Sequence, residues 1–383
     1  MTRSRSVLVP FGTRPEVVKL APVVTALTAA GHRVDVVDTG QHTDPALAGE
    51  LQQALGLVPT RRFALPTDSP ASRLGALHAD AARAVGEYRP DVVLALGDTN
   101  TVPAYALAAR GAGIPFAHLE AGLRSLNPRS VEEVNRRVAA AVAALHLAPT
   151  RRAAAFLAAE GVPDERVFVV GNPVVDTLVG RGVRAVPVAE RTGVLVTAHR
   201  PTNVDDPVRL KRLVGIVRSL AEQVGPVTFP VHPRTAGRLA ATGLDAELDH
   251  PAISLSGPVG YDELLTALAS ARIAVTDSGG IQEEAAYLGV PVVVLRGSTP
   301  RWEGVEAGTT TLASLADDSA ADAVLAAAAR HTAPAELARA ASLPCPYGDG
   351  TTGPQVAAIL ADEATDALLA IEEPDFTDGR LPW

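Results

Sequence analysis

The chain has 383 residues, of which 47% are hydrophobic and 20% are charged, so we expect a globular protein of about two domains. Its net charge of -9 argues against a nucleic-acid partner, which would require a basic face. A bound phosphate must then be met by a few placed residues. The single cysteine, Cys345, excludes an intrachain disulfide and a cysteine-rich zinc site, and we expect no metal.

The N-terminal stretch MTRSRSVLVPFGTRP carries basic residues, but its apolar run stops after a few residues, at Gly12. That run is too short for a signal peptide. No segment reaches the roughly 20 apolar residues that are needed to span a bilayer. We therefore expect a cytoplasmic protein that has no membrane partner.

Short β-branched runs alternate with longer segments rich in Ala and Leu from end to end. The runs are SVLVPFG, RVDVVDTG, DVVLALGD, PFAHLEA, LHLAPT and RVFVVGN, and then GVLVTAH, VTFPVH, AISLSG, RIAVTDS and VPVVVLRG. This alternation is typical of an α/β protein with parallel sheets. The runs form two sets, which predicts one sheet in each of two domains.

A stretch without apolar periodicity, VGRGVRAVPVAERTG, separates the two sets of runs and is rich in Gly, Pro and Arg. We place the domain linker there. The predicted domains are residues 1–178 and 179–354, and a helix within residues 355–372 is expected to pack back on the first domain. The final segment, PDFTDGRLPW, is expected to be loose.

Polar residues and glycines follow nearly every predicted strand. The segments are Gly12-Thr13-Arg14, Gly40-Gln41-His42, Gly97-Asp98-Thr99-Asn100, Glu120-Ala121-Gly122, His199-Arg200, His232-Pro233 and Asp277-Ser278-Gly279. In open parallel sheets, ligands bind beyond the carboxyl ends of the strands. We expect these segments to gather at one edge of each domain, and the two edges to face a central cleft.

One of these strand ends, TDSGGIQEEAAYLGVPVVVL, predicts a strand, a turn, a helix and a second strand. Ser278, Gly279 and Gly280 leave the first amide groups of the helix open, which suits a phosphate or diphosphate. Glu283 and Glu284 are expected in the first turn, where they could accept hydrogen bonds from a ribose diol. The alternative from this stretch alone is that Ser278 caps the helix and the acids complement its positive end.

Charged residues with a possible chemical role occur in both predicted domains. Lysine occurs only at Lys19 and Lys211 in a chain that otherwise uses arginine, so Lys19, early in the helix that follows Arg14, stands out. The acids Asp98, Glu120, Glu132 and Glu133 lie near strand ends of the first domain, and His199 and His232 lie at strand ends of the second. Acids and bases on two sides of a cleft suit proton transfer.

Several motifs together resemble the non-hydrolysing bacterial UDP-N-acetylglucosamine 2-epimerases. They are GTRPE, GQH, GDTNT, HLEAGLRS, EEVNRR, GNPVVD, TAHR, VHP, TDSGGIQEEA, PRWEGVEAGT and YGDG, in the order and spacing of that family from about Val7 to Ile371. The resemblance implies two Rossmann-like domains around a cleft (GT-B-like), a UDP-sugar substrate, no cofactor and a homodimer. It also assigns site residues.

By this resemblance, the diphosphate would lie against Arg14, Ser278, Gly279 and Gly280, and the ribose would lie against Glu284. Arg301 would reach the sugar or phosphate side, and Lys19, Arg136 and His232 would also contact substrate. The resemblance assigns catalysis to Asp98, Glu120, Glu132 and His199. It leaves open which carboxylate is the base and which is the acid.

The chemistry of the sugar restricts the route. The C2 hydrogen has no carbonyl group beside it, so direct removal of the proton is prohibitive. Oxidation by a bound NAD would need a predicted strand that opens onto a G-x-G-x-x-G fingerprint, and no predicted strand here does so. The resemblance implies elimination of UDP to give a glycal, followed by re-addition, with His199, Arg14 and Arg301 stabilising the departing UDP.

The chain departs from the family pattern at several positions. Thr202 replaces the usual glutamate after His199-Arg200, and Thr43 replaces a basic residue after Gln41-His42. A proline is missing before Glu132, and Thr351 stands where the family has lysine. These changes cluster where the bacterial enzymes hold a second, activating substrate molecule. Three interpretations stay open. The first is an epimerase without this activation, the second is an epimerase that acts on another nucleotide sugar or releases UDP by hydrolysis, and the third is a glycosyltransferase or sugar-nucleotide binder on the same plan.

Overall fold

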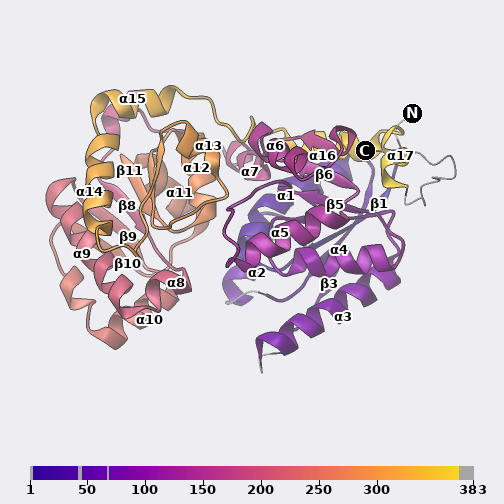
Figure 1. Cartoon of the computed structure of the whole chain (residues 1–383), viewed down its shortest axis with the longest axis horizontal. Helices are drawn as coiled ribbons and strands as arrows, with labels where there is room; N and C mark the ends of the chain where they lie inside the picture. Colours follow the sequence, from indigo (N-terminus) through magenta and orange to yellow (C-terminus); the bar gives the residue numbers. More distant parts are fainter. Residues whose placement is uncertain (1–2, 42–44, 67–68, 371–383) are drawn as a thin grey trace. The chain divides into compact units, whose positions relative to one another are not determined.

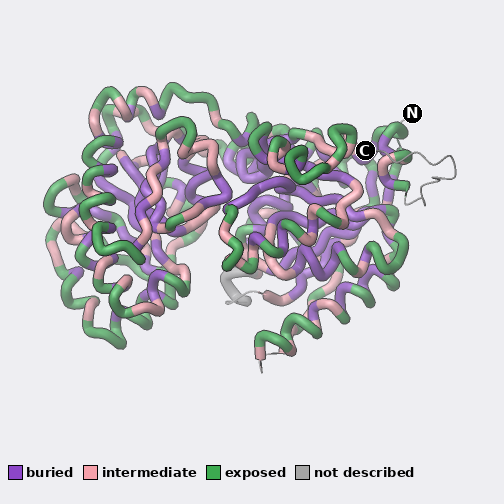
Figure 2. The backbone as a smooth tube through the Cα atoms, viewed as in Figure 1, coloured by how far each residue is buried: buried purple, intermediate pink, exposed green. Residues whose placement is uncertain are grey.

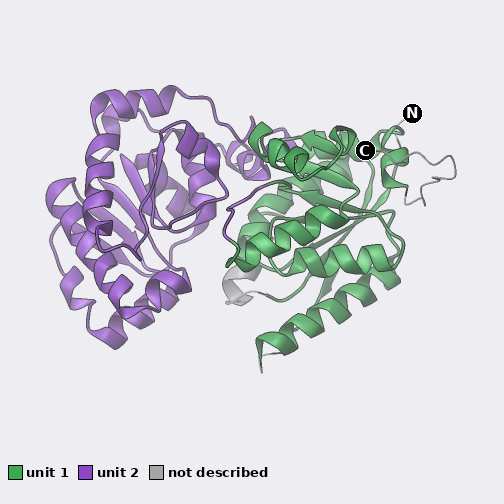
Figure 3. Ribbon diagram, viewed as in Figure 1, with its two compact units in different colours: residues 1–122, 128–170, 353–383 green, residues 123–127, 171–352 purple. Residues whose placement is uncertain are grey.

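The structure is a computed structural model that describes residues 3–41, 45–66 and 69–370. The chain divides into two compact units, which Figure 3 colours separately: unit 1 comprises residues 1–122, 128–170 and 353–383, and unit 2 comprises residues 123–127 and 171–352. The division into compact units does not show which segments fold independently. The domain boundaries expected after residues 178 and 354 therefore stay predictions. The expected loose end, PDFTDGRLPW, lies outside the described residues.

Unit 1 is built on a seven-stranded sheet of order β3-β2-β1-β4-β5-β6-β7, and all its paired strands run parallel. Its strands are β1 (Ser6–Phe11), β2 (Arg33–Asp38), β3 (Arg61–Arg62), β4 (Val92–Leu96), β5 (Phe116–Leu119), β6 (Leu145–Ala148) and β7 (Val167–Val169). Its helices are α1 (Arg14–Ala29), α2 (Pro45–Ala54), α3 (Pro70–Tyr88), α4 (Thr101–Gly111), α5 (Val131–Val142), α6 (Arg151–Ala159) and, near the C-terminus, α16 (Thr352–Ala361) and α17 (Thr365–Leu369).

Unit 2 has a six-stranded parallel sheet of order β10-β9-β8-β11-β12-β13. Its strands are β8 (Val194–Thr197), β9 (Val227–Pro230), β10 (Ile253–Ser256), β11 (Ile273–Thr276), β12 (Val292–Val294) and β13 (Thr310–Leu312). Its helices are α7 (Pro173–Gly180), α8 (Pro201–Val204), α9 (Pro207–Gln223), α10 (Pro233–Thr242), α11 (Tyr261–Ser270), α12 (Gly279–Leu288), α13 (Trp302–Glu306), α14 (Ala320–His331) and α15 (Pro334–Ser342). The predicted α/β class with two parallel sheets is confirmed.

Alternate residues of a central strand pack into two different hydrophobic clusters, one on each face of the sheet. In unit 2, Val194 and Val196 of β8 pack with Leu213 of α9 in one buried cluster, whereas Leu195 packs with Ile281 of α12 in another. Side chains on a strand alternate between its two faces, so both faces of this sheet are apolar and covered by helices. Figure 2 shows the consequence in both units: the central strands are buried, and exposed residues lie on the outer sides of the helices.

Local sequence signals set where the helices begin and end. At the start of α9, the Asp206 side chain accepts hydrogen bonds from the Val208 and Arg209 amides, at 2.9 and 3.1 Å, and Pro207 follows it directly. Helix α12 ends at Gly289, whose φ of 60° is the left-handed conformation that glycine adopts without strain. These signals fix the start of α9 and the end of α12.

The C-terminal helices pack on the first strand of unit 1. Val356 and Leu360 of α16 are fully buried. The guanidinium Nε of buried Arg5 donates to the Leu360 carbonyl at 2.6 Å, and Arg5 also pairs with Asp366 of α17. Over the described residues, no helix combines the length and the apolar composition that crossing a membrane requires.

Candidate active site

Unit 1 brings several predicted site residues to the carboxyl ends of its central strands. Arg14 opens α1 after β1, Asp98 follows β4, and Glu120 follows β5. Strands β1 and β4 are neighbours from which the chain continues in opposite directions across the sheet. Such a switch point is where open α/β sheets bind ligands, because the loops on either side diverge and leave a crevice.

Glu16 connects the loops on the two sides of this switch point. Its Oε2 atom accepts hydrogen bonds from the Gly12 amide at 3.0 Å, the Thr13 amide at 2.7 Å and the Thr13 hydroxyl at 2.8 Å. Its Oε1 atom accepts from the Thr99 hydroxyl at 2.9 Å. The sequence signal for the first set is the T-x-x-E spacing of a capping box, which our interpretation overlooked. The Thr99 bond has no sequence signal.

Burial makes Glu16 an unusual acid. Its side chain is almost fully buried, and desolvation raises its pKa from 4.5 to about 7, although the hydrogen bonds from Thr13, Gly12 and Thr99 act in the opposite direction. Between pH 4.5 and about 7, the folded chain keeps a proton on Glu16 that the unfolded chain has released. The contribution of Glu16 to stability is therefore present at acidic pH and is lost as the pH rises through this window.

Glu16→Gln removes this titration. We expect the free energy of unfolding of the variant, relative to wild type, to rise by on the order of 3 kcal/mol as the pH crosses the window. A change in hydrogen bonding that does not depend on pH would alter the free energy of unfolding of the variant by the same amount at every pH, so it would not change how this difference varies with pH. Urea unfolding at a series of pH values would measure the difference, and a difference that stays constant with pH would contradict the raised pKa.

Lys19 and Glu120 form a buried ion pair in unit 1. The Lys19 ammonium contacts Glu120 Oε1, and both side chains are only about one-twentieth exposed, at 6% and 5%. Glu120 also has a φ of 64°, a left-handed conformation that costs a residue with a Cβ of order 1 kcal/mol or more. A strained backbone and a buried cation thus fix the direction of this carboxylate. Lys19 is bonded to a candidate catalytic acid in this structure.

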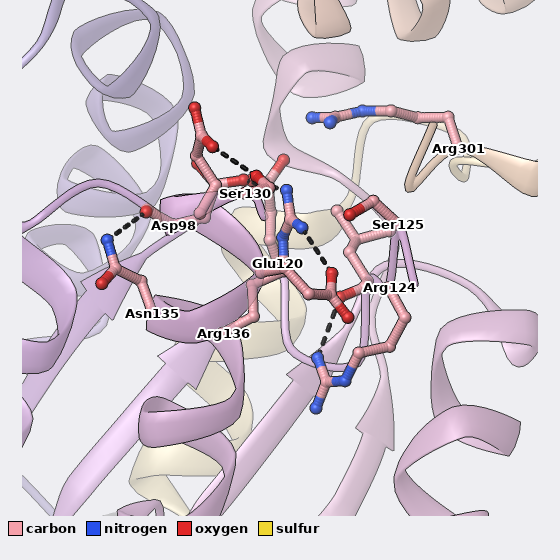
Figure 4. Close-up of polar contacts among 12 residues, drawn as sticks. Asp98, Glu120, Arg124, Ser125, Ser130, Asn135, Arg136 and Arg301 are labelled. Atoms are coloured by element: carbon pink, nitrogen blue, oxygen red, sulfur yellow. Dashed lines mark hydrogen bonds and ion pairs between the residues drawn. The ribbon is translucent and has the colours of Figure 1, made fainter. Parts of the chain in front are cut away.

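Asp98 is held by two residues of α5, as Figure 4 shows. The Arg136 guanidinium contacts Asp98 Oδ2, and it also donates to Glu133 at 2.9 Å. The Asn135 amide donates to the Asp98 carbonyl at 2.9 Å. Glu133 and Arg136 are buried, whereas Asp98 is half-buried. The neighbouring acid Glu132 is half-buried and accepts a hydrogen bond from the Ser130 hydroxyl.

In unit 2, the glycine turn forms the expected open helix end. Ser278 is the N-cap residue of α12, but its side chain makes no capping hydrogen bond, and Gly279 begins the helix. A Cβ built on Gly279 would lie 2.8 Å from Arg301 Nη1, whereas one on Gly280 would meet only the Ser278 hydroxyl, at 4.0 Å. The Arg301 guanidinium therefore lies against Gly279, which adds a cation to the amides of the helix end.

The two adjacent glutamates of α12 have different partners. Because the helix begins at Gly279, they lie in its second turn, so the expectation of the first turn was wrong. Glu283 is fully buried and accepts a hydrogen bond from Arg301 Nε at 2.8 Å, so it positions that cation. Glu284 is 6% exposed and accepts a hydrogen bond from the Tyr261 hydroxyl at 2.8 Å.

His199 and His232 lie side by side in unit 2. Their ring centroids are 5.4 Å apart, and the rings are tilted by 34°. His232 is exposed and caps α10, where its Nδ1 accepts a hydrogen bond from the Arg234 amide at 3.2 Å. His199 is half-buried, and its Nδ1 lies 3.3 Å from Asp277 Oδ1. Sequence reasoning noted Asp277 only as part of the turn and gave it no role.

The structure thus groups the predicted residues within each unit. Unit 1 holds Arg14, Lys19, Asp98, Glu120, Glu132 and Arg136, and unit 2 holds His199, His232, Ser278, Gly279, Gly280, Glu284 and Arg301. In the part of the chain that the structure describes, no three His, Cys, Asp or Glu side chains are grouped so that they could hold a metal ion. Each group pairs acids or histidines with arginines, a combination suited to proton transfer beside a phosphorylated ligand.

A family model described as UDP-N-acetylglucosamine 2-epimerase matches residues 25–361. Among curated proteins, the probable UDP-N-acetylglucosamine 2-epimerase of Ralstonia solanacearum is 37% identical over 377 residues, covering 92% of this chain and 97% of that protein. The UDP-N-acetylglucosamine 2-epimerase of Methanocaldococcus jannaschii is 36% identical over 316 residues, covering 79% of this chain and 86% of that protein.

Solved structures of UDP-N-acetylglucosamine 2-epimerases are also similar to this chain. The UDP-GlcNAc 2-epimerase of M. jannaschii, in complex with UDP-GlcNAc and UDP, superposes with a TM-score of 0.81 at 31% identity and covers 93% of this chain and 99% of that one. The enzyme of Neisseria meningitidis bound to UDP-GlcNAc gives a TM-score of 0.80 at 28% identity, covering 92% and 98% of the two chains. A kitacinnamycin glycotransferase, at 17% identity and a TM-score of 0.60, shares the fold alone.

Proposed function

We propose, because this chain belongs to the UDP-N-acetylglucosamine 2-epimerase family, that it inverts C2 of UDP-N-acetylglucosamine to give UDP-N-acetylmannosamine. The observation that carries this assignment is the set of acids at the strand ends of unit 1. Asp98 is held by Arg136 and Glu120 by Lys19, so both carboxylates are fixed in direction and supported as anions. Ordered carboxylates of this kind suit transfer of a carbon-bound proton.

The proposed route is elimination followed by re-addition. One carboxylate takes the C2 proton while the bond between C1 and the diphosphate oxygen breaks, and the electron pair of the C–H bond forms the C1–C2 double bond of a glycal. UDP leaves with the electron pair of the broken bond. Re-addition of UDP at C1 with delivery of a proton to the opposite face of C2 gives the epimer, so no redox cofactor is consumed. Asp98, Glu120 and Glu132 supply the proton-transfer groups.

The same route needs cations and donors on the leaving diphosphate. We assign the diphosphate to Arg14, Arg301, Ser278 and the amides of Gly279 and Gly280, and the ribose to Glu284. The packing of Arg301 against Gly279 supports this assignment, because charge and amide donors then act on one anion. His199 is assigned to the departing UDP. Lys19, Arg136 and His232 are assigned to substrate contacts, although Lys19 and Arg136 also hold the acids.

A second candidate substrate is another UDP-sugar with an acetamido group at C2. The UDP-2,3-diacetamido-2,3-dideoxy-D-glucuronate 2-epimerase of Pseudomonas aeruginosa is 34% identical over 320 residues, which is close to the identities of the proteins named above. The elimination route is the same for both sugars, because it uses only C1, C2 and UDP. A glycosyltransferase or a simple binder would not need three ordered acids, which favours an epimerase.

Proton NMR of the purified protein with UDP-N-acetylglucosamine in D2O tests the assignment. We expect both epimers to appear with deuterium at C2, because the abstracted proton exchanges with solvent. Free N-acetylmannosamine would instead indicate hydrolysis, and turnover of only the diacetamido sugar would move the assignment to that substrate. An unchanged spectrum with every UDP-sugar would overturn the epimerase assignment in favour of a binder.

A cytoplasmic location and a homodimer complete the assignment. Light scattering checks the second part: we expect a mass of twice the 39.5 kDa of one chain. A mass of 39.5 kDa would show a monomer. Fractionation of cells that express the protein would check the first part.

The departures at Thr43 and Thr202 predict simple kinetics. Thr202 lies in the short helix α8, where its carbonyl accepts a hydrogen bond from Arg209, and Thr43 lies outside the described residues. Without a basic residue and a glutamate at these positions, a second substrate molecule loses its charge anchor and an acceptor. An empty activator site produces no coupling. Turnover of UDP-N-acetylmannosamine alone should begin without a lag, whereas a lag that trace UDP-N-acetylglucosamine abolishes would show that the activator site survives.

A further inference from the structure

Asp277 is a fully buried carboxylate that organises the loop around His199. Its oxygens accept hydrogen bonds from the His199 amide at 3.1 Å, the Arg200 amide at 2.9 Å and the Asn203 side-chain amide at 3.1 Å. Asn203 is itself fixed, because its amide also donates to the Leu295 carbonyl at 3.1 Å. Every one of these partners is a donor, so both oxygens of Asp277 act as acceptors.

The same carboxylate sets the tautomer of His199. Nδ1 of the ring lies 3.3 Å from Asp277 Oδ1, and a carboxylate has no proton to donate, so this contact favours the tautomer with the ring proton on Nδ1. The lone pair of the neutral ring is then on Nε2, the nitrogen that does not contact Asp277. The His199 side chain is 40% exposed, so a ligand can reach it. In this tautomer, Nε2 can accept a proton but has none to donate.

The surroundings of His199 keep the free ring neutral. Burial lowers its pKa below 6.5, Asp277 raises it in part, and Arg200 and Arg234 lower it further. Asp205 pairs with Arg234 at 2.7 Å, which moderates that cation. The neighbouring ring of His232 has its Nδ1 occupied by the Arg234 amide, so its own proton lies on Nε2. At neutral pH, therefore, the free His199 ring brings no positive charge to this helix end.

We propose that Asp277 is a positioning residue that makes His199 take up one proton at Nε2 when a diphosphate binds. This inference rests on the nucleotide site of the proposed function. Asp277 directly precedes Ser278, Gly279 and Gly280, the residues assigned to the diphosphate. The loop that Asp277 organises and this assigned anion site are therefore parts of one turn. A diphosphate placed there adds negative charge beside the exposed side of the ring, while Asp277 already holds Nδ1–H on the other side.

The proton comes from solvent and forms a new N–H bond at Nε2, and the imidazolium is then flanked by two anions. Its Nε2–H becomes a donor to a phosphate oxygen. The departing UDP in the elimination step thus receives a charged hydrogen bond that the free protein does not offer. Binding of UDP is then coupled to the uptake of a proton. The affinity for UDP should consequently fall as the pH rises above neutrality, because the proton concentration falls.

Calorimetry of UDP binding at neutral pH, in two buffers with different ionisation enthalpies, measures the number of protons taken up. We expect about one proton per UDP for wild type and none for His199→Asn. Asp277→Asn should also abolish most of the uptake, because an amide can donate to Nδ1 and reverse the tautomer. His250→Asn is the control, an imidazole of unit 2 that lies outside the assigned site and accepts a hydrogen bond from the Ala252 amide, and it should keep the uptake.

Asp277→Asn could disturb the loop, so Asn203→Ala serves as a second variant that removes a loop donor but leaves the acid. It should retain proton uptake even if UDP affinity falls. Wild-type binding without proton uptake, full uptake by His199→Asn, or no UDP binding would each overturn the inference. The epimerisation assay separates the two hypotheses. Proton uptake on UDP binding without epimerisation would support this inference but not the proposed function. Epimerisation without proton uptake would support the proposed function but not this inference.

Discussion

Asp98→Asn, Glu120→Gln and Glu132→Gln should each lower kcat by roughly 100-fold or more while leaving the fold intact. Each change keeps the size of the side chain but removes its ability to take or give a proton. The binding of UDP should change little, because the nucleotide is assigned to residues other than these three acids. Steady-state kinetics in both directions and calorimetry with UDP would separate the two effects.

The control for this series is Asp164→Asn, an exposed acid of unit 1 that lies outside the strand ends. It should retain wild-type kcat. Circular dichroism should show the same secondary structure for all four variants. Near-full activity in all three test variants would show that these acids do not carry out the proton transfer.

Glu283→Ala and Glu284→Ala should differ in their effect on stability, although the residues are adjacent. Glu283 is fully buried against Arg301, so its loss leaves a cation without its partner and should lower the free energy of unfolding by about 3–5 kcal/mol. Glu284→Ala should change stability far less and weaken UDP binding by roughly 10- to 100-fold, because the lost acceptor is assigned to the ribose.

Urea unfolding and calorimetry with UDP on both variants form a matched test. Glu283→Ala should also bind UDP less well, since Arg301 would lose the contact that holds it against Gly279. The decisive comparison is therefore stability. Equal losses of stability in the two variants would contradict the separate roles, and unchanged UDP affinity in Glu284→Ala would return that residue to a structural role beside Tyr261.

The strand pattern was the most predictable part of the fold. Each apolar run noted in the sequence contains one strand, because buried parallel strands need continuous β-branched segments. The strands that sequence reasoning missed are β3, which is Arg61–Arg62, and β13, which is Thr310–Leu312. Both lie at sheet edges and are two or three residues long. Segments so short and partly polar carry no periodicity to detect.

The site was predictable in its residue types but not in its pairings. Strand ends identified Asp98 and Glu120, yet their cations Arg136 and Lys19 are 38 and 101 residues away in the chain. No local pattern reports contacts of that range. Glu16 was missed although it has the local T-x-x-E signal, but its bond from Thr99, like the bond from Asn203 of α8 to Asp277, joins segments that no local pattern connects.

The division of unit 1 into distant segments has a consequence during synthesis on the ribosome. Residues 171–352 emerge before residues 353–370, so unit 2 can be complete while unit 1 still lacks α16 and α17. Until then, Arg5 and His32 have no Leu360 and Ala357 carbonyls to contact, and the apolar surface that Leu360 covers stays open.

Translation of the intervening segment takes on the order of 10 s or more at typical rates. For that time the nascent first unit exposes an incomplete core, a target for chaperones and for misassembly between neighbouring chains on one messenger. A ribosome that stalls near residue 352 would leave a finished unit 2 attached to an unfinished unit 1.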